Sequence, residues 1–393
     1  MRREGQMRTV IFGAVIGLVV LVVSLSFAPK ILNVVNPIGN ESVQDLGNLS
    51  GDDDGNGGSS TQTGTEAWSV TAPGPVESSP TFKNGKVYIG GSHVLYALDS
   101  DTGNKKWEYD AGTDIWAKPV LSNGVVFVGT INGKMLAVNS GDGSVKWSKN
   151  IVDRIIVAGV EVYNGEVYVP VRESNSFAGD APGNLSIRYA DGGARDTWFQ
   201  TSYSIETRPE IENGHIYVTT TGGYLYRIDA SNLYNWNAKQ FGSEIRSSPT
   251  VATVDGERFV FFGQYGGKVY KVNTALGVNN TFHTGQQVRS QPTVKNGAVY
   301  VGSNNEKIYK LDATTMDKIW AFETGGPVVT QPAVVGGTVY VTSMDGKLYA
   351  LDADTGNKKW EFSTGGGITS SPAVGDDKVY FGSRDGKIYA VNR

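Results

Sequence analysis

Residues 330–366 read TQPAVVGGTVYVTSMDGKLYALDADTGNKKWEFSTGG, and the pattern returns with few changes in residues 370–393 as SSPAVGDDKVYFGSRDGKIYAVNR. Further copies fill the chain from about residue 65 onward, at a spacing of about 40 residues. A fixed spacing of this length indicates supersecondary units that stack along a line or around an axis. There are eight copies, and the eighth stops at Arg393, before its last predicted strand.

Each copy carries the turn and strand signals of an antiparallel sheet. A dipeptide such as Asn84-Gly85 or Asn296-Gly297 precedes a β-branched and aromatic run, as expected of a hairpin turn between two strands. A second turn, Asp345-Gly346 in the seventh copy, leads into an alternating strand that ends in Asp352. A fourth strand carries an aromatic residue. Each copy is therefore predicted to be a four-stranded sheet.

The two ends of the chain complement each other. The eighth copy lacks a fourth strand, while Thr63–Trp68 supplies a fourth-strand sequence with no strands before it. Pairing of the two would leave no long sheet edge open. The prediction is an all-β, eight-bladed β-propeller of four-stranded antiparallel blades, closed by strands from both termini. The aromatic residues that stand near the same place in the fourth strand are Trp68, Trp107, Trp147, Trp198, Trp236, Phe282, Trp320 and Trp360.

Composition narrows the possible functions. The chain has 51 Gly, 19 Tyr and 8 Trp in 393 residues, which is typical of a turn-rich β-protein. Its formal net charge is -4, and no run of Lys or Arg crosses the repeats, so nucleic acid is not expected as a partner. The absence of cysteine excludes disulfides and thiolate chemistry. The three histidines lie in separate copies, and no metal or catalytic constellation is predicted.

The N-terminal segment predicts a membrane anchor. Three arginines within residues 1–9 precede an uncharged stretch of residues 10–28, long enough to cross a bilayer as a transmembrane helix. Basic residues stay in the cytoplasm, so the polar linker of residues 29–64 and the propeller of residues 65–393 are expected outside the cell membrane. A signal peptide cleaved after Ala28 is the alternative, although Pro29 disfavours the cut. Candidate glycosylation sites are Asn40, Asn48, Asn184 and Asn279.

One position varies where the repeats otherwise agree. It lies three residues before the proline that opens each copy, with Gly159 taken as the replacement for that proline in the third copy. Symmetry would place these residues in a ring at one mouth of the central channel. They are Glu77, Trp116, Ile156, Glu206, Arg246, Arg289, Val329 and Thr369.

This ring is the predicted partner-binding rim. Aromatic and Arg side chains are enriched at binding hot spots, and Arg pairs suit carboxylates or phosphates. A rim of Glu77, Trp116, Lys118, Glu206, Arg246 and Arg289 is therefore expected to bind an anionic or peptide-like partner. The alternative is that these charges pair with one another or face water. The third copy also has an extra stretch, residues 172–193, where a specific contact or a neutral insertion would fit.

The repeat resembles the pyrroloquinoline-quinone-like (PQQ-like) β-propeller family over residues 65–393. The similarity lies in a Ser-Pro strand start, a Val-Tyr-Val-Gly strand, a Leu-Tyr-Ala-Leu-Asp strand and a Thr-Gly-x-x-x-Trp close. The resemblance implies that the Thr-Gly and Trp elements dock each blade on its neighbour. It also implies one of two functions: alcohol oxidation with quinone cofactor and calcium, or a non-catalytic scaffold like the lipoprotein subunit of the outer-membrane assembly machinery.

Two features favour the scaffold. The dehydrogenases of this family place a disulfide of adjacent cysteines against the cofactor, and this chain has no cysteine. Most copies also leave no room for the long insertions that carry calcium ligands in those enzymes. The Asp-x-Asp-Thr-Gly sequences at Asp99 and Asp352 are predicted to form Asx turns and not calcium loops. No cofactor or metal is predicted. A PQQ/calcium-dependent alcohol dehydrogenase and a glycan-binding or cell-surface structural propeller are the alternatives.

Overall fold

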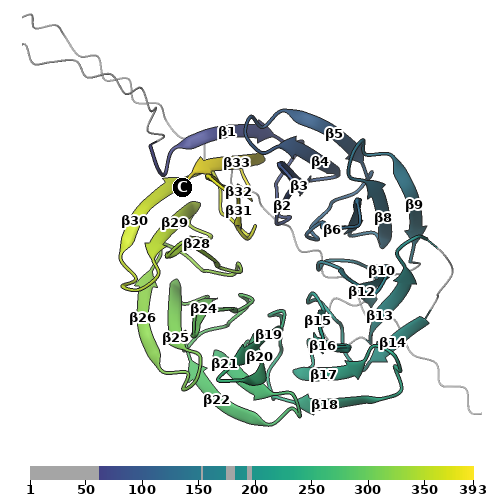
Figure 1. The fold of residues 1–393 in the computed structure, drawn as a ribbon, viewed down its shortest axis with the longest axis vertical. Coiled ribbons are helices and arrows are strands. Elements are labelled where there is room, and N and C mark those ends of the chain that lie inside the picture. The colour runs from purple at the N-terminus through teal and green to yellow at the C-terminus, as the bar shows by residue number, and fades with distance from the viewer. Residues whose placement is uncertain (1–61, 152–153, 174–181, 193–196) are drawn as a thin grey trace, which may run out of the picture. The chain divides into compact units, whose positions relative to one another are not determined.

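Strands account for all the regular secondary structure in the described part of the chain. The computed structural model describes residues 62–151, 154–173, 182–192 and 197–393. Its strands form eight antiparallel sheets arranged as blades around a common axis (Figure 1). The predicted all-β, eight-bladed propeller is confirmed. Seven blades have four strands, whereas the third blade has five because β10 and β11 both pair with β12.

The strands follow the order of the blades. The first four blades comprise β2 (Thr81–Lys83), β3 (Lys86–Gly91), β4 (Val94–Asp99), β5 (Lys105–Asp110); β6 (Val120–Ser122), β7 (Val125–Gly129), β8 (Lys134–Asn139), β9 (Val145–Asn150); β10 (Arg154–Ile155), β11 (Glu161–Tyr163), β12 (Glu166–Glu173), β13 (Gly183–Tyr189), β14 (Thr197–Thr201); and β15 (Glu210–Glu212), β16 (His215–Thr219), β17 (Tyr224–Asp229), β18 (Trp236–Gln240). The last four comprise β19 (Thr250–Val254), β20 (Glu257–Gly263), β21 (Lys268–Asn273), β22 (Val278–His283); β23 (Thr293–Lys295), β24 (Ala298–Ser303), β25 (Lys307–Asp312), β26 (Lys318–Glu323); β27 (Ala333–Val335), β28 (Thr338–Thr342), β29 (Lys347–Asp352), β30 (Lys358–Ser363); and β31 (Ala373–Val374), β32 (Lys378–Gly382), β33 (Lys387–Asn392), β1 (Glu66–Thr71).

The ring is closed by its two ends. Strand β1 pairs antiparallel with β33, so that Trp68 lies opposite Ala390 and Thr71 opposite Lys387. Figure 1 shows the two strands side by side, with β1 on the outer circumference and β33 inside it. The backbone of Gly64 also donates to the carbonyl of Asn392, at 2.7 Å. The eighth blade is therefore built from both termini, as the incomplete last copy predicts.

The hairpin turns have the backbone conformation that their sequences demand. Asn84 and Gly85 have φ of 53° and 67°, and Asn296 and Gly297 have φ of 50° and 72°. A two-residue hairpin with positive φ at both positions matches the right-handed twist of its strands, and Asn-Gly tolerates that conformation best. These turns join the innermost strand of a blade to the second strand, and they fix the register on which the channel lining depends.

Neighbouring blades meet through a glycine at the end of the second strand. A Cβ added to Gly90 would lie 2.5 Å from the side chain of Ile115 in the next blade, and one added to Gly129 would lie 2.3 Å from Ile156. The aliphatic side chain fills the space that the glycine leaves, and both Ile115 and Ile156 are buried. This explains why the Val-Tyr-Val-Gly strand ends in glycine.

Tryptophan fixes the outer part of five blade junctions. Trp107 of β5 lies against Gly143 of the second blade, where an added Cβ would come within 2.8 Å of the indole ring. Its Nε1 donates to the carbonyl of Ser140, at 3.1 Å. Gly143 has φ of 76°, so both its conformation and its lack of a side chain are needed. The tryptophans that lie against such a glycine are Trp68, Trp107, Trp147, Trp320 and Trp360.

The other three predicted docking residues, Trp198, Trp236 and Phe282, do not lie against such a glycine. Trp236 and Phe282 still contact a neighbouring blade, with ring centroids 5.7 Å from Phe199 and 5.2 Å from Tyr309, respectively. Trp198 and Trp236 are 65% and 48% exposed. Strand register shows the cause for Trp236, because Asn237 pairs with Arg227 as Trp107 pairs with Ala97. In the fifth blade, Asn280 pairs with Lys271 where Trp320 pairs with Lys310, so Phe282 stands two residues beyond the docking position.

Several N-terminal predictions fall outside the described residues. These are the transmembrane helix of residues 10–28, residues 29–61 of the linker, and Asn40 and Asn48. In the part that the structure describes, no helix is long and apolar enough to cross a membrane. Of the other two glycosylation candidates, Asn184 lies within β13, paired with Val171 and Gln200, and Asn279 is exposed on β22.

Candidate functional site

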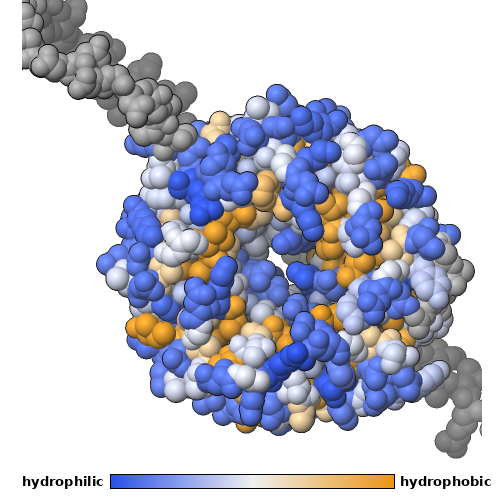
Figure 2. Space-filling model, viewed as in Figure 1, coloured by the Kyte–Doolittle hydropathy of each residue, from blue (hydrophilic) through white to orange (hydrophobic). Residues whose placement is uncertain are grey.

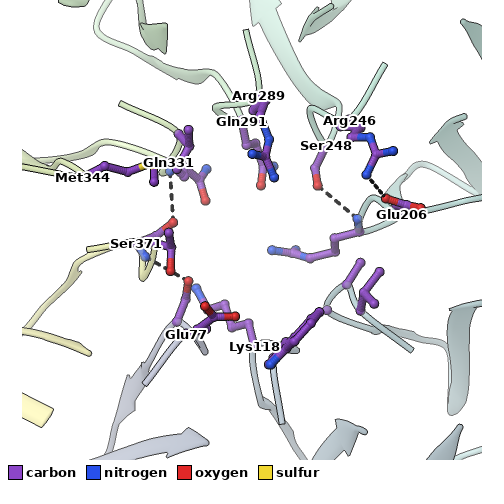
Figure 3. Close-up of a pocket in the computed structure, with 18 of the residues that line it drawn as sticks. Glu77, Lys118, Glu206, Arg246, Ser248, Arg289, Gln291, Gln331, Met344 and Ser371 are labelled. Atoms are coloured by element: carbon purple, nitrogen blue, oxygen red, sulfur yellow. Dashed lines mark hydrogen bonds and ion pairs between the residues drawn. The ribbon is translucent and has the colours of Figure 1, made fainter. Parts of the chain in front are cut away.

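The central channel opens into a cavity of about 540 Å³ at one mouth. Two positions from every blade line it: the residue three before the strand-opening proline, here called the first ring, and the residue one before it, here called the second ring (Figure 3). The first ring is Glu77, Trp116, Val157, Glu206, Arg246, Arg289, Val329 and Thr369. The second ring is Ser79, Lys118, Gly159, Arg208, Ser248, Gln291, Gln331 and Ser371. The structure therefore brings the predicted rim together around one cavity.

The third blade corrects the alignment used to predict the first ring. Strand β11 begins at Glu161 as β15 begins at Glu210, so Val160 occupies the position of Pro209. Gly159 therefore belongs to the second ring and does not replace the proline. Ile156 is buried between blades and does not reach the channel, where Val157 takes its place.

Hydrogen bonds between blades hold both rings in position. In six blades the residue between the two ring positions is Ser or Thr, and in those blades it does not line the cavity. Ser247 Oγ donates to the carbonyl of Ser290 at 2.8 Å, and Ser290 Oγ donates to the carbonyl of Thr330 at 2.7 Å. Ser78 Oγ likewise donates to the carbonyl of Ala117, at 2.9 Å. These hydrogen bonds join the backbone segments that carry the two rings. The ring side chains therefore project from a rigid support. Figure 2 shows one face of the ring, hollowed at its centre.

Both carboxylates of the first ring are ion-paired. Glu206, largely buried, lies between Arg246 of the next blade and Arg172 of β12, whose Nη1 is 2.9 Å from Oε1. Glu77 contacts Arg384 of the eighth blade at 2.8 Å. The predicted alternative, that the rim charges pair with one another, therefore holds for these groups. Arg208 is also paired, with Glu161 at 2.6 Å.

Two cations at the cavity have no such partner. Among the residues that the structure describes, neither Lys118 nor Arg289 forms an ion pair, and Figure 3 shows them on opposite sides of the cavity. The pKa of Lys118 is lowered to about 8, mainly by burial and then by the charge of Arg208, while Glu161 acts in the opposite direction. The hydroxyl of Thr369 is buried in the same lining without a hydrogen-bond partner in the described residues. The site thus offers donors and positive charge to a ligand.

The second ring and Arg384 were not predicted as rim residues, with the exception of Lys118. A signal for the ring existed: side chains on an extended strand alternate, so a residue two positions after a channel-facing one should also face the channel. Arg384 lies in the turn between β32 and β33, and Met344 lies in the equivalent turn of the seventh blade. These turns reach the channel mouth only through the packing of whole blades, which the repeat pattern does not display.

The channel side chains do not fit a calcium and quinone centre. Its carboxylates, Glu77 and Glu206, belong to the first and fourth blades, and each faces an arginine. In the described ranges, no group of three or more His, Cys, Asp or Glu side chains could hold a metal ion. Asp99 and Asp352 form Asx turns, with Asp352 Oδ1 accepting from the backbone N–H of Thr355 at 3.0 Å. These bonds lower the pKa of Asp352 to about 2.

Comparison with known proteins places the fold and the family. Among solved structures, BamB from Moraxella catarrhalis matches with a TM-score of 0.67 and 15% identity, over 84% of this chain and 99% of that chain. A quinohemoprotein alcohol dehydrogenase from Comamonas testosteroni matches with a TM-score of 0.69 and 15% identity, over 84% of this chain and 76% of that chain. The computationally designed Ika8 protein matches with a TM-score of 0.67 and 13% identity, over 85% and 100%. At these identities the structures share the fold alone.

The sequence itself gives the family. A search of curated protein sequences found no match. The family model described as outer membrane protein assembly factor BamB matches three overlapping segments, residues 58–232, 117–280 and 279–393. Together these segments cover the whole propeller, in agreement with the resemblance of the repeat to PQQ-like propellers. The chain therefore belongs to the PQQ-like propeller family described as outer membrane protein assembly factor BamB.

Proposed function

We propose that this protein is a non-catalytic assembly scaffold that binds a protein partner at the channel mouth on the extracytoplasmic side of a membrane. The observation that carries the proposal is the excess of positive charge at the cavity: five cationic side chains line it beside two carboxylates that are already ion-paired. Membership of a family described as an assembly factor supports a protein partner. The predicted anchor, residues 10–28, would hold the propeller at the membrane.

The cavity favours an acidic, extended segment as the bound part of the partner. A volume of about 540 Å³ admits a few side chains but no folded domain. Lys118 and Arg289 would meet carboxylates from opposite sides, and such charge-assisted bonds are stronger than neutral ones. Trp116, 42% exposed at the rim, adds an apolar surface of the kind found at binding hot spots. An acidic loop or tail that carries aromatic or aliphatic residues would use all of these groups.

Charge reversal at Arg289 tests the channel site. Arg289→Glu should weaken binding of a fluorescein-labelled peptide of alternating Glu and Tyr by at least about tenfold, or about 1.4 kcal/mol. Arg289 forms no ion pair in the described residues, so the variant should not disrupt a native pair. Lys295→Glu is the matched control, because Lys295 is exposed on β23 of the same blade and lies outside the channel lining. Fluorescence anisotropy of the full-length protein at low and high salt gives the affinities.

Three results would count against the channel site. They are equal affinities of the two variants, equal binding of a matched Lys and Tyr peptide, and binding that is insensitive to salt. Screening weakens exposed charge interactions, so the affinity of an acidic segment for the wild-type channel should fall as salt is raised. The titration should be repeated with quinone cofactor and calcium, because stoichiometric binding of these would favour a dehydrogenase instead.

The anchor requires a separate test. Full-length protein should sediment with membranes and resist extraction by alkaline carbonate, whereas a chain lacking residues 1–28 should be soluble in the same fractionation. The apolar stretch would supply the membrane affinity, since the polar linker that follows contains Gly51–Ser60 and no comparable apolar segment. If the shortened chain stays with the membrane to the same extent, the attachment lies elsewhere.

A further inference from the structure

Aromatic pairs fill the outer part of three consecutive blade junctions. In each pair, the fourth strand of one blade supplies a phenylalanine and the third strand of the next blade supplies a tyrosine. The rings pack with centroids 5.2 to 5.5 Å apart in the pairs Phe282 with Tyr309, Phe322 with Tyr349 and Phe362 with Tyr389. Aromatic rings at this spacing attract each other beyond the effect of burial alone. The chain itself therefore places aromatic side chains here.

The junction between the second and third blades lacks the tyrosine. In the seventh blade, Ala350 lies opposite the tyrosine of the Val-Tyr-Val strand, and Tyr349 directly precedes it. In the third blade, Ile187 lies opposite the corresponding tyrosine, and Ser186 directly precedes it. Ser186 therefore holds the position of Tyr349. It is buried, at 8% exposed, but has no ring to fill the junction.

The same junction also lacks the phenylalanine. Phe362 follows the docking tryptophan of β30 by two residues and lies opposite Leu348. Lys149 follows Trp147 of β9 by two residues and lies opposite Met135, which is the equivalent register. The side chain of Lys149 is exposed. Neither position of the aromatic pair therefore carries a ring at this junction.

A cavity of about 280 Å³ lies beside Ser186. Ile151, just after the last strand of the second blade, and Val171 of β12 give its lining an apolar part. Asn150 and Asn184 add amide groups, which suit the hydroxyl of a phenol. An apolar cavity of about 150 Å³ can hold a benzene ring, so this one has room for the side chain of a tyrosine.

Trp198 adds an aromatic surface to the cavity. It lies opposite Ser186 in register, so the two side chains share one face of the third blade. Glu361 lies opposite Tyr349 in the seventh blade, so the tryptophan is not part of the repeat. Trp198 is 65% exposed, and β14 lies on the outer circumference of the ring (Figure 1). A ligand can therefore approach the cavity from outside the ring.

We propose that the cavity between the second and third blades binds a tyrosine side chain of a partner protein. Its ring would lie against Trp198, in the space that the aromatic pair fills at other junctions. Ring contacts of this kind contribute beyond burial, and an aromatic wall with a few polar groups is typical of ligand pockets. The site lies outside the channel lining and goes beyond the proposed channel function.

Titration of the full-length protein with N-acetyl-3-fluorotyrosine amide, followed by fluorine NMR, tests this site. Ser186→Tyr should weaken binding by at least about tenfold and raise the melting temperature, because it restores the ring that the chain places at other junctions. Ser186→Ala is the matched control and should leave the affinity unchanged, since the cavity stays open. Trp198→Ala should weaken binding by about fivefold with little change in melting temperature. Trp236→Ala, which removes a half-exposed tryptophan outside this cavity, should leave binding unchanged.

Several outcomes would overturn the proposal. They are absence of binding, equal affinities of Ser186→Tyr and Ser186→Ala, and equal affinities of Trp198→Ala and Trp236→Ala, a comparison that holds even if Ser186→Tyr does not fold. A tyrosine-containing peptide should bind more tightly than free p-cresol, and equal affinity would indicate a small phenol and contradict a protein partner. Arg289→Glu should leave binding of the probe intact, so failure of this site and failure of the channel site can be told apart. Ser186→Tyr likewise removes the contribution of this cavity from the channel titration.

Discussion

Replacement of Trp107 by alanine is expected to lower the free energy of unfolding by about 3–5 kcal/mol, as for other buried aromatic residues cut to alanine. Trp107 is 7% exposed between the first two blades. Its ring lies against Gly143 and, at a centroid distance of 5.9 Å, against Tyr88. Its Nε1 donates to the carbonyl of Ser140. The truncation removes the ring contacts and a hydrogen bond together, and the fixed glycine turn cannot close the cavity that remains.

Trp198→Ala is the matched control for this effect. Trp198 stands in the fourth strand of a blade and was predicted from sequence to have the same role, yet it is 65% exposed. Its removal should change stability by no more than about 0.5 kcal/mol. Urea unfolding of the full-length protein, followed by far-UV circular dichroism, compares two variants that each lack one tryptophan. Similar losses for the two would mean that the docking role does not depend on the glycine contact.

The sequence predicted the arrangement of strands well because each blade repeats similar turns and a similar strand pattern. Asn-Gly pairs tolerate positive φ, neighbouring blades bury both faces of the Val-Tyr-Val run, and the unpaired fourth strand at the N-terminal end closes the ring by pairing with the incomplete last copy. These constraints are local or follow from symmetry. The turns and the strand pattern recur in most copies, so they outweigh variation at single positions.

The errors came from shifts of one or two residues that spacing alone does not reveal. Pairing of β4 with β5 has a register shift between Ala97 and Leu98, whereas pairing of β17 with β18 has none. Because β18 lacks the extra residue that β5 has at this shift, Trp236 stands one residue before the docking position and is 48% exposed. The same kind of shift places Val157 in the channel and Ile156 in the core.

The positions of the residues in the candidate site could be predicted from the sequence, but the ion pairs that they form could not. Ring positions follow from the repeat, so Arg246, Arg289 and Glu206 could be assigned to one mouth. The sequence does not show which charges pair with each other, because Arg172 reaches Glu206 from the longer strand of the third blade. The two unpaired cations become visible only after these contacts are known.

Replacement of Lys118 by methionine should stabilise the protein and weaken its binding of acidic peptides. Burial and the nearby Arg208 lower the pKa of Lys118 from 10.5 to about 8, so the folded protein binds this proton less tightly than the unfolded chain. The resulting loss of stability is fully present below pH 8 and disappears as pH rises toward 10.5. At neutral pH it amounts to about 1–3 kcal/mol. Methionine has a similar length and no charge to desolvate.

Two measurements together decide whether Lys118 serves binding. Urea unfolding at several pH values should show that the wild-type protein gains stability between pH 8 and 10.5 relative to Lys118→Met, while Lys83→Met, at the exposed end of β2, should match wild type. Peptide anisotropy should show weaker binding for Lys118→Met alone. A lower stability of Lys118→Met, or a pH profile that is the same as wild type, would mean that the ammonium is solvated. Lys118 lowers stability because it is buried without an ion-pair partner among the described residues. A carboxylate of a bound ligand would neutralise its charge, so the same residue would raise affinity.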